Sequence, residues 1–230
     1  MDNNKKKRDE ILDGILQYYK KRKSKISPGA ASRETKLIRY REAFLKIGVP
    51  PLGERRLLDV GCFTGNWLVW ACNEWGGKLE NCWGVELRSD VVERGRQMYP
   101  GIQLMASSAD KLQFPDEHFD IAHHSMMFSS IPDETLRKDI ATEMWRVLKR
   151  GGYVAWFDYI WNPFNRNVCG MRKKNIFALF PDAEWTYCKR IVLAPPIARF
   201  LNVISDRAIF LLEKARILNA YYLCLLRKPK

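Results

Sequence analysis

The feature that most constrains the fold is the stretch of residues 57–65, which reads LLDVGCFTG. Apolar residues surround Asp59, glycines follow at positions 61 and 65, and an amphipathic run covers residues 67–75. This order predicts a buried strand, a tight turn and a helix. Glycine adopts backbone angles that other residues avoid, and it lets a ligand approach the main chain closely. A helix start also offers unpaired N–H groups, so we predict a ligand-binding turn here.

Two common nucleotide-binding motifs are missing from this turn. A dinucleotide-binding fingerprint needs G-x-G-x-x-G, and a phosphate-binding loop needs a lysine directly after its last glycine. The turn contains only Gly61 and Gly65, and no lysine follows Gly65. It therefore favours a nucleoside ligand without a pyrophosphate. Its D-x-G-C-x-x-G form resembles motif I of the class I S-adenosylmethionine-dependent methyltransferases, which implies four cofactor-binding residues: Asp59, Gly61, Cys62 and Gly65.

The next predicted strand, residues 81–86, ends in a second candidate for cofactor binding. Glu86 follows Gly61 by about one βαβ unit. A carboxylate at the end of a second parallel strand can accept hydrogen bonds from both hydroxyls of a ribose. The alternative is a solvated charge at a strand end, which the pairing with the glycine turn disfavours. We predict that Glu86 and the adjacent Leu87 bind the cofactor.

A third strand end follows at about the same interval. A short apolar run, residues 102–106, leads to Ser108, Ala109 and Asp110. In the methyltransferases that motif I resembles, an acidic residue here receives the adenine amino group, beside backbone N–H groups that meet the ring nitrogens. The resemblance therefore implies cofactor contacts for these three residues. Ligand groups at three successive strand ends agree with binding at the carboxyl edge of a parallel sheet.

Two later motifs extend the resemblance. Residues 112–122 (LQFPDEHFDIA) are similar to the family signature L-P-F-(P)-D-x-x-F-D, and residues 146–152 (RVLKRGG) to R-V-L-K-P-G-G, with Arg150 where proline is usual. Gly151 is expected to end the helix here, and a strand is expected over residues 153–160. The resemblance, in particular to the broad type-11 group, covers roughly residues 36–160. It implies a Rossmann-like α/β sandwich whose seven-stranded sheet is mostly parallel, with an antiparallel last strand.

The N-terminal 50 residues are predicted to form basic helices that cap the cofactor site. Helical spacing over residues 9–23 is flanked by basic clusters, which suit contact with an anionic membrane surface or nucleic acid. The alternative is a helix packed on the domain with its charges solvated. A second helix is expected to begin at Ser32. In methyltransferases of this type such a helix often covers the cofactor. Residues 51–160 then form the cofactor-binding core and 161–230 the acceptor side of the same single domain.

Composition bounds the class of protein. The chain has 230 residues, 47% of them hydrophobic, enough for one α/β domain with a sizeable core. Its net charge of +13 suits an anionic partner such as nucleic acid or anionic lipid, or a basic surface with no specific partner. The six cysteines form no C-x-x-C pair, so no zinc site is recognisable and a reducing, cytoplasmic setting fits best. No secretory signal or apolar run of about 18 residues is present, so we predict a cytoplasmic protein, with peripheral contact to the inner membrane surface as an open alternative.

The loop after strand five is the candidate acceptor site. Asn162, Asn165 and Arg166 suit a polyhydroxylated or anionic acceptor, although asparagine and proline also form plain turns. Strands are expected over residues 185–193 and 221–226, with a helical insertion between them. This tail resembles a methyltransferase subset found in bacterial surface-polysaccharide gene clusters.

Methyl transfer to oxygen requires alignment of donor and acceptor and is helped by a general base. His123 and His124 lie at the end of predicted strand four, and strand alternation sends only one of them toward the site. We predict that His124 is the base and that His123 contacts the cofactor; a structural role for either is the alternative. Asp158, near the end of strand five, is the second candidate base.

The sequence therefore favours an enzyme that uses S-adenosylmethionine to methylate an oxygen on a small hydroxylated molecule, glycan or glycolipid. An RNA methyltransferase is the alternative within the enzyme class, favoured by the charge. The Asn-Pro-Pro-Tyr or Asp-Pro-Pro-Tyr motif of exocyclic amino methylation is missing, because residues 124–127 read HSMM. A non-catalytic methyltransferase-like partner protein is the reading outside the enzyme class, and the intact cofactor residues disfavour it. No metal ligand set is predicted.

Overall fold

The computed structural model describes residues 2–21, 30–49, 51–161, 168–194, 212 and 218–230. One seven-stranded sheet organises them, with the strands in the order β3-β2-β1-β4-β5-β7-β6. The strands are β1 (Leu57–Val60), β2 (Cys82–Glu86), β3 (Gln103–Ala106), β4 (Phe119–Ser125), β5 (Leu148–Tyr159), β6 (Glu184–Leu193) and β7 (Asn219–Arg227). Strands β1 to β5 pair in parallel, and β7 pairs antiparallel with both of its neighbours. The predicted Rossmann-like sheet with an antiparallel last strand is confirmed.

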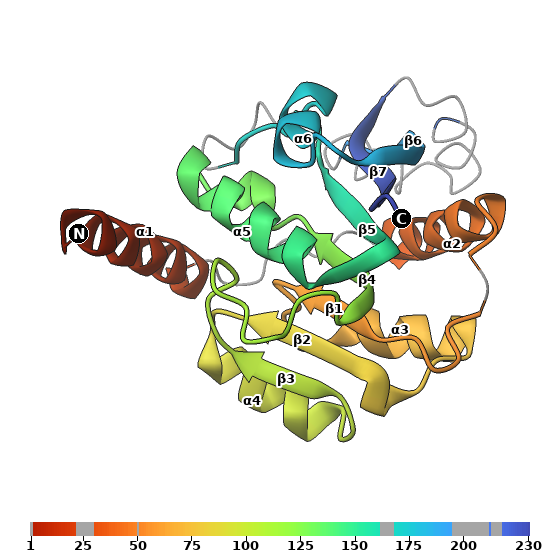
Figure 1. The fold of residues 1–230 in the computed structure, drawn as a ribbon, viewed down its shortest axis with the longest axis horizontal. Helices are drawn as coiled ribbons and strands as arrows, with labels where there is room; N and C mark the ends of the chain where they lie inside the picture. Colours follow the sequence, from red (N-terminus) through yellow and green to blue (C-terminus); the bar gives the residue numbers. More distant parts are fainter. Residues whose placement is uncertain (1, 22–29, 50, 162–167, 195–211, 213–217) are drawn as a thin grey trace.

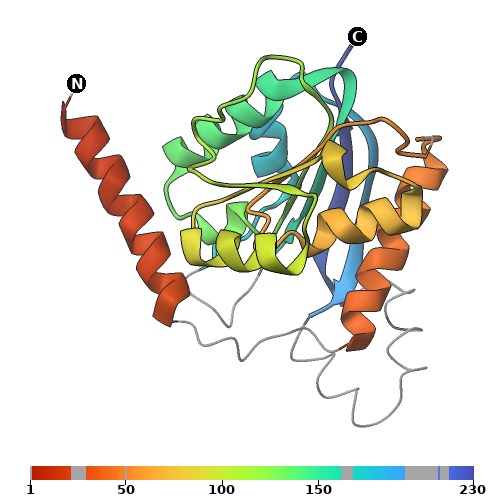
Figure 2. The ribbon, with the colours of Figure 1, turned by 90° about the horizontal axis from the view of Figure 1, so that it is seen from below.

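Helices cover both faces of this sheet (Figure 1). They are α1 (Asp2–Lys21), α2 (Ala30–Lys46), α3 (Asn66–Trp75), α4 (Ser89–Met98), α5 (Glu134–Val147) and α6 (Lys173–Leu179), with short 3-10 turns η1 (Leu79–Asn81) and η2 (Phe128–Ser130). Figure 2 shows α1 and α2 on opposite sides of the sheet. No helix in the described ranges has both the length and the apolar character that crossing a membrane would require.

Two apolar clusters form the core, one on each face of the sheet. One contains the buried side chains of α2 and α3 together with Leu57, and the other contains those of α5 and α6 together with Leu58. Successive residues of β1 thus enter different clusters, as strand alternation requires. The same alternation governs β4, and it decides where its two histidines lie.

Local chemistry explains the helix that precedes β5. The carboxylate of Asp133 caps α5 by accepting a hydrogen bond of 2.7 Å from the backbone N–H of Leu136. The inner face of this helix, residues 136, 140, 144 and 147, is buried. The helix therefore holds one side of β4 and β5 in place.

Two predicted boundaries differ from the structure. Helix α2 begins at Ala30, two residues before Ser32, because the two alanines are strong helix formers. Gly151 lies inside β5 at a φ of 75° and does not end α5. Its N–H donates to Lys228 near the C-terminus, so pairing with a distant segment overrides the local helix-stop signal. The predicted helical insertion between residues 193 and 221 lies mostly outside the described residues.

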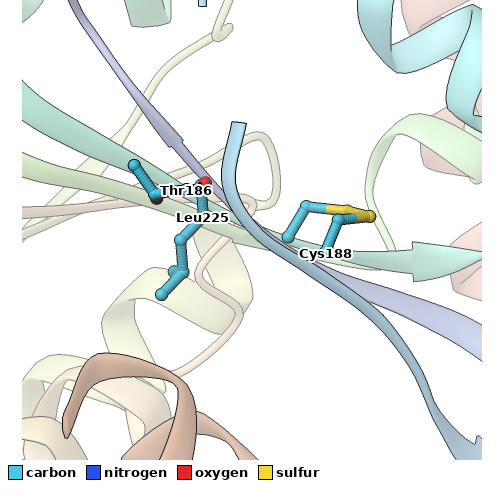
Figure 3. Close-up of a disulfide and its surroundings, with 4 residues drawn as sticks. Thr186, Cys188 and Leu225 are labelled. Atoms are coloured by element: carbon cyan, nitrogen blue, oxygen red, sulfur yellow. Dashed lines mark hydrogen bonds between the residues drawn. A yellow bond between two sulfur atoms is a disulfide. The ribbon is translucent and has the colours of Figure 1, made fainter. Parts of the chain in front are cut away.

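A disulfide joins Cys188 of β6 to Cys224 of β7 (Figure 3). The two cysteines are direct partners in the register of these antiparallel strands. Beside them the hydroxyl of Thr186 donates a hydrogen bond of 2.8 Å to the carbonyl oxygen of Leu225. Cysteine spacing in the sequence does not indicate this pair, because its members lie 36 positions apart in the chain and meet only when the sheet forms.

Candidate active site

The loop between β1 and α3 has an unusual backbone. Gly61 and Gly65 adopt left-handed φ angles of 72° and 84°, and Phe63 between them also has a positive φ of 53°. The N–H groups of Gly61 and Cys62 both donate to the carbonyl oxygen of Val85, at 2.8 and 3.2 Å. These bonds fasten the loop to β2. A side chain at Gly65 would meet the terminal methyl group of Ile102, which would have to move, and the positive φ also disfavours any other residue here.

Glu86, at the end of β2, is tied to the same loop. One carboxylate oxygen accepts a hydrogen bond of 3.1 Å from the N–H of Phe63, and the other accepts one of 3.1 Å from the N–H of Arg88. Burial raises the pKa of Glu86, while these backbone donors oppose the rise. The residue between Glu86 and Arg88, Leu87, is half-buried. The structure thus brings the glycine loop and the predicted ribose carboxylate together.

The third predicted strand end lies beside the second. The N–H of Ser107 donates to the carbonyl oxygen of Glu86 at 3.1 Å, and the hydroxyl of Ser108 donates to the carboxylate of Asp110. The side chain of Asp110 is only 2% exposed, and Arg8 of α1 approaches it to 2.7 Å. Residue Ala109 and apolar side chains of α1 pack on the same core cluster. Helix α1 therefore reaches the end of the sheet where Asp110 lies.

His123 lies beneath the loop, fully buried. Its Nδ1 is 2.7 Å from a carboxylate oxygen of Asp59, and its Nε2 is 2.8 Å from the hydroxyl oxygen of Tyr40. The ring of Trp67 stacks on it at 3.6 Å. Burial lowers the pKa of His123 well below its usual value and raises the pKa of Asp59 to about 8. Neither Tyr40 nor Trp67 was singled out from the sequence, because an aromatic residue on an apolar helix face indicates only a core position.

His124 points to the opposite face of the sheet. Its ring meets those of Trp156 and Phe128 edge-on at centroid distances of 4.1 and 4.7 Å. Among the described residues neither ring nitrogen has a hydrogen-bond partner, and burial lowers the pKa of His124 well below its usual value. A general base must reach the proton that it accepts. This geometry does not favour the predicted catalytic role of His124.

Asp158 of β5, the other predicted base, is also fully buried, but unlike His124 it has hydrogen-bond partners among the described residues. Its carboxylate oxygens accept backbone hydrogen bonds from Ser129 at 2.9 Å and from Tyr159 at 2.7 Å. Burial raises the pKa of Asp158 to about 6, close to the range in which general bases operate. Helix α2 contacts the neighbouring strand, β4, because the ammonium group of its Lys36 donates a hydrogen bond of 2.9 Å to the hydroxyl of Ser125. The predicted acceptor residues Asn162, Asn165 and Arg166 lie outside the described residues.

The groups at this edge fit S-adenosylmethionine. Carboxylates stand at two neighbouring strand ends, where a ribose and a base amino group need acceptors, and a glycine turn precedes them. A family model described as a methyltransferase domain matches residues 57–152, which include all three strand ends. Residues 57–152 form a class I, S-adenosylmethionine-dependent methyltransferase domain.

Curated relatives match the same part of this methyltransferase domain. A demethylmenaquinone methyltransferase of Lysinibacillus sphaericus is 32% identical over 103 residues, which cover 44% of this chain and 42% of that protein. The enzyme of the same name from Listeria welshimeri is 29% identical over 107 residues, 44% of each chain. The chain thus matches less than half the length of these relatives.

Solved structures share the fold over most of the chain. Geranyl diphosphate C-methyltransferase from Streptomyces coelicolor, solved with S-adenosylhomocysteine, superposes with a TM-score of 0.65 at 14% identity, covering 95% of this chain and 98% of that one. A methyltransferase from Mesorhizobium loti gives 0.59 at 18% identity, covering 87% and 99%. The [4+2]-cyclase SpnF also gives 0.59 at 18% identity, covering 89% and 85%. Since a cyclase shares the methyltransferase fold, function has to be argued from the site.

Proposed function

We propose that this protein transfers a methyl group from S-adenosylmethionine to an oxygen of a hydroxylated small molecule, glycan or glycolipid. The observation that carries the proposal is the hydrogen bond between the N–H of Phe63 and the carboxylate of Glu86. It holds the glycine loop and the acidic strand end in one rigid unit, as a bound nucleoside would need. Correct alignment of the methyl donor with the acceptor is the main contribution that a protein makes to methyl transfer.

The proposed cofactor contacts follow from the chemistry of each group. Glu86 accepts hydrogen bonds from the ribose hydroxyls, and Asp110 accepts one from the adenine amino group. Backbone groups of the loop, residues 61–65, approach the rest of the cofactor. Bound S-adenosylmethionine supplies a methyl group on a positively charged sulfur. Arg8 lies against Asp110, so α1 closes the adenine end of the site.

On the acceptor side we assign the base to Asp158. With a pKa of about 6, its carboxylate is ionised at neutral pH and can take the proton of an acceptor hydroxyl. Its two backbone hydrogen bonds hold the carboxyl group in a fixed orientation. Asn162, Asn165 and Arg166, which follow Asp158 closely in the chain, are the proposed contacts for a hydroxylated or anionic acceptor.

The curated relatives are named for demethylmenaquinone, which favours a small-molecule acceptor over RNA. A lipid-borne acceptor would also give the positive charge of +13 a role, because anionic membrane surfaces attract basic proteins. We therefore also propose that the N-terminal segment makes peripheral contact with the inner membrane surface. RNA is the second candidate, and the same charge supports it.

Transfer of labelled methyl groups from S-adenosylmethionine into fractionated host extract tests this proposal. Glu86→Ala protein serves as the blank, after circular dichroism has shown that it is folded. Label that resists nuclease and partitions with lipid or glycan supports the leading acceptor class. Label released by ribonuclease makes RNA the acceptor. Absence of transfer above the blank in every fraction contradicts the enzymatic proposal.

A further inference from the structure

The imidazole of His123 contacts three separate elements. Asp59 of β1 and Tyr40 of α2 lie within hydrogen-bond distance of its two nitrogens, at 2.7 and 2.8 Å. Trp67 of α3 covers one ring face, with the two planes only 6° apart. His123 and Tyr40 have no exposed surface, and Asp59 is 3% exposed. One buried ring on β4 thus joins β1, α2 and α3.

Two of these contacts flank the cofactor loop. Asp59 comes just before the loop at residues 61–65, and Trp67 lies in the first turn of the helix that follows it. Loop residues take left-handed backbone angles that cost free energy, so their surroundings must hold them. Because Asp59 and Trp67 both contact the ring of His123, the two ends of the loop are held in place. His123 therefore acts on the loop through Asp59 and Trp67, the two residues that flank it.

Tyr40 completes the hydrogen bonding of this ring. If Asp59 is ionised, Nδ1–H donates to the carboxylate and Nε2 accepts from the phenol hydroxyl. If Asp59 is protonated, both hydrogen bonds reverse direction and the chain stays intact. Since burial raises the pKa of Asp59 to about 8, both states occur near neutral pH. The phenol hydroxyl suits either arrangement, because it both donates and accepts.

We propose that Tyr40 is a positioning residue for the cofactor loop, acting through His123. Its hydroxyl fixes the ring, the ring fixes Asp59 and Trp67, and these fix the loop and the N–H that holds Glu86. Helix α2, outside the segment matched by the methyltransferase model, thereby becomes part of the cofactor site. The inference rests on the proposed function, since it assumes that the loop binds S-adenosylmethionine.

Removal of single hydroxyl groups tests this inference. Tyr40→Phe deletes only the contact to His123. Tyr221→Phe is the matched control, because Tyr221 of β7 is also buried and its hydroxyl hydrogen-bonds to Tyr159 of β5 rather than to His123. Calorimetry measures the affinity for S-adenosylhomocysteine, and thermal unfolding measures stability. We expect Tyr40→Phe to weaken binding about 5- to 20-fold, the effect of one buried hydrogen bond, and the control to change it less than about twofold.

A second variant keeps the test decisive if Tyr40→Phe folds poorly. In His123→Asn the side-chain amide can still donate to Asp59 but is too short to reach Tyr40. It should lose as much affinity as Tyr40→Phe, and the double variant should lose little more, since both break one chain. Equal affinity of wild type and both single variants, even with lowered melting temperatures, overturns the inference. Wild-type protein that binds no S-adenosylhomocysteine overturns the proposed function and this inference with it.

Discussion

The backbone N–H of Phe63 and the carboxylate of Glu86 lie 3.1 Å apart and form a hydrogen bond. This contact joins residues that come from different strand ends. The second carboxylate oxygen is held by the N–H of Arg88. Glu86 is therefore oriented in advance, which lowers the entropy cost of cofactor binding.

Glu86→Ala should weaken binding of S-adenosylhomocysteine by about 1.5–3 kcal/mol, the scale of hydrogen bonds to a charged group. Glu93→Ala, which removes an exposed carboxylate of α4, is the control. Isothermal titration calorimetry measures both. A loss below about 0.5 kcal/mol for Glu86→Ala would mean that the ribose is held elsewhere.

Asp158→Asn should lower turnover by about 10²- to 10⁴-fold, the usual contribution of a general base, with cofactor affinity unchanged. In wild type the rate should fall as pH drops below about 6, because the carboxyl group is then protonated. Asp120→Asn is the control, since Asp120 also accepts a backbone hydrogen bond but lies at the start of β4. Full turnover of Asp158→Asn in the labelled-transfer assay would remove this residue as the base.

Gly65→Ala should destabilise the fold more than Gly76→Ala. Both glycines have positive φ angles and flank α3, but only at Gly65 would a new side chain collide with a neighbour, Ile102. We expect a loss of about 1 kcal/mol at Gly76 from backbone strain alone, and about 2–4 kcal/mol at Gly65. Urea unfolding measures both values. Equal losses would show that the loop relaxes away from Ile102.

Asp59 should make stability fall as pH rises. Its pKa is about 8 in the folded protein against an ordinary value of 3.8, so the folded state retains a proton that the unfolded state releases. The stabilising contribution is complete below about pH 4 and is lost as pH rises toward 8. Asp59→Asn should flatten this part of the profile in urea unfolding at a series of pH values. Parallel profiles for the two proteins would contradict the assignment.

Much of the fold could be predicted because its signals are local. The glycine turn, the acidic strand ends and the apolar face of α5 each occupy a few neighbouring residues, and the resemblance to class I methyltransferases implies the mostly parallel sheet with its antiparallel last strand. Glu86 and Asp110 are placed by the same logic, and their roles in cofactor binding stay predictions. The predicted end of α5 and start of β5 differ from the structure, because Gly151 pairs with the distant Lys228 and lies inside β5.

The polar network under the loop could not be predicted. Alternation separates His123 from His124 correctly, but it does not say which face carries the ligand. His124 meets Phe128 and Trp156 only in the folded sheet. The partnership of Tyr40 with His123 joins positions 83 residues apart, and the disulfide depends on the register of β6 with β7. Contacts of this range leave no local pattern.

Calorimetric titration of the wild-type protein with S-adenosylhomocysteine tests the central claim most directly. We predict one-to-one binding with a dissociation constant of about 1–100 μM, in the range usual for enzyme ligands, and clear weakening in Glu86→Ala. Absence of binding to folded wild-type protein, or equal binding to both proteins, would contradict it.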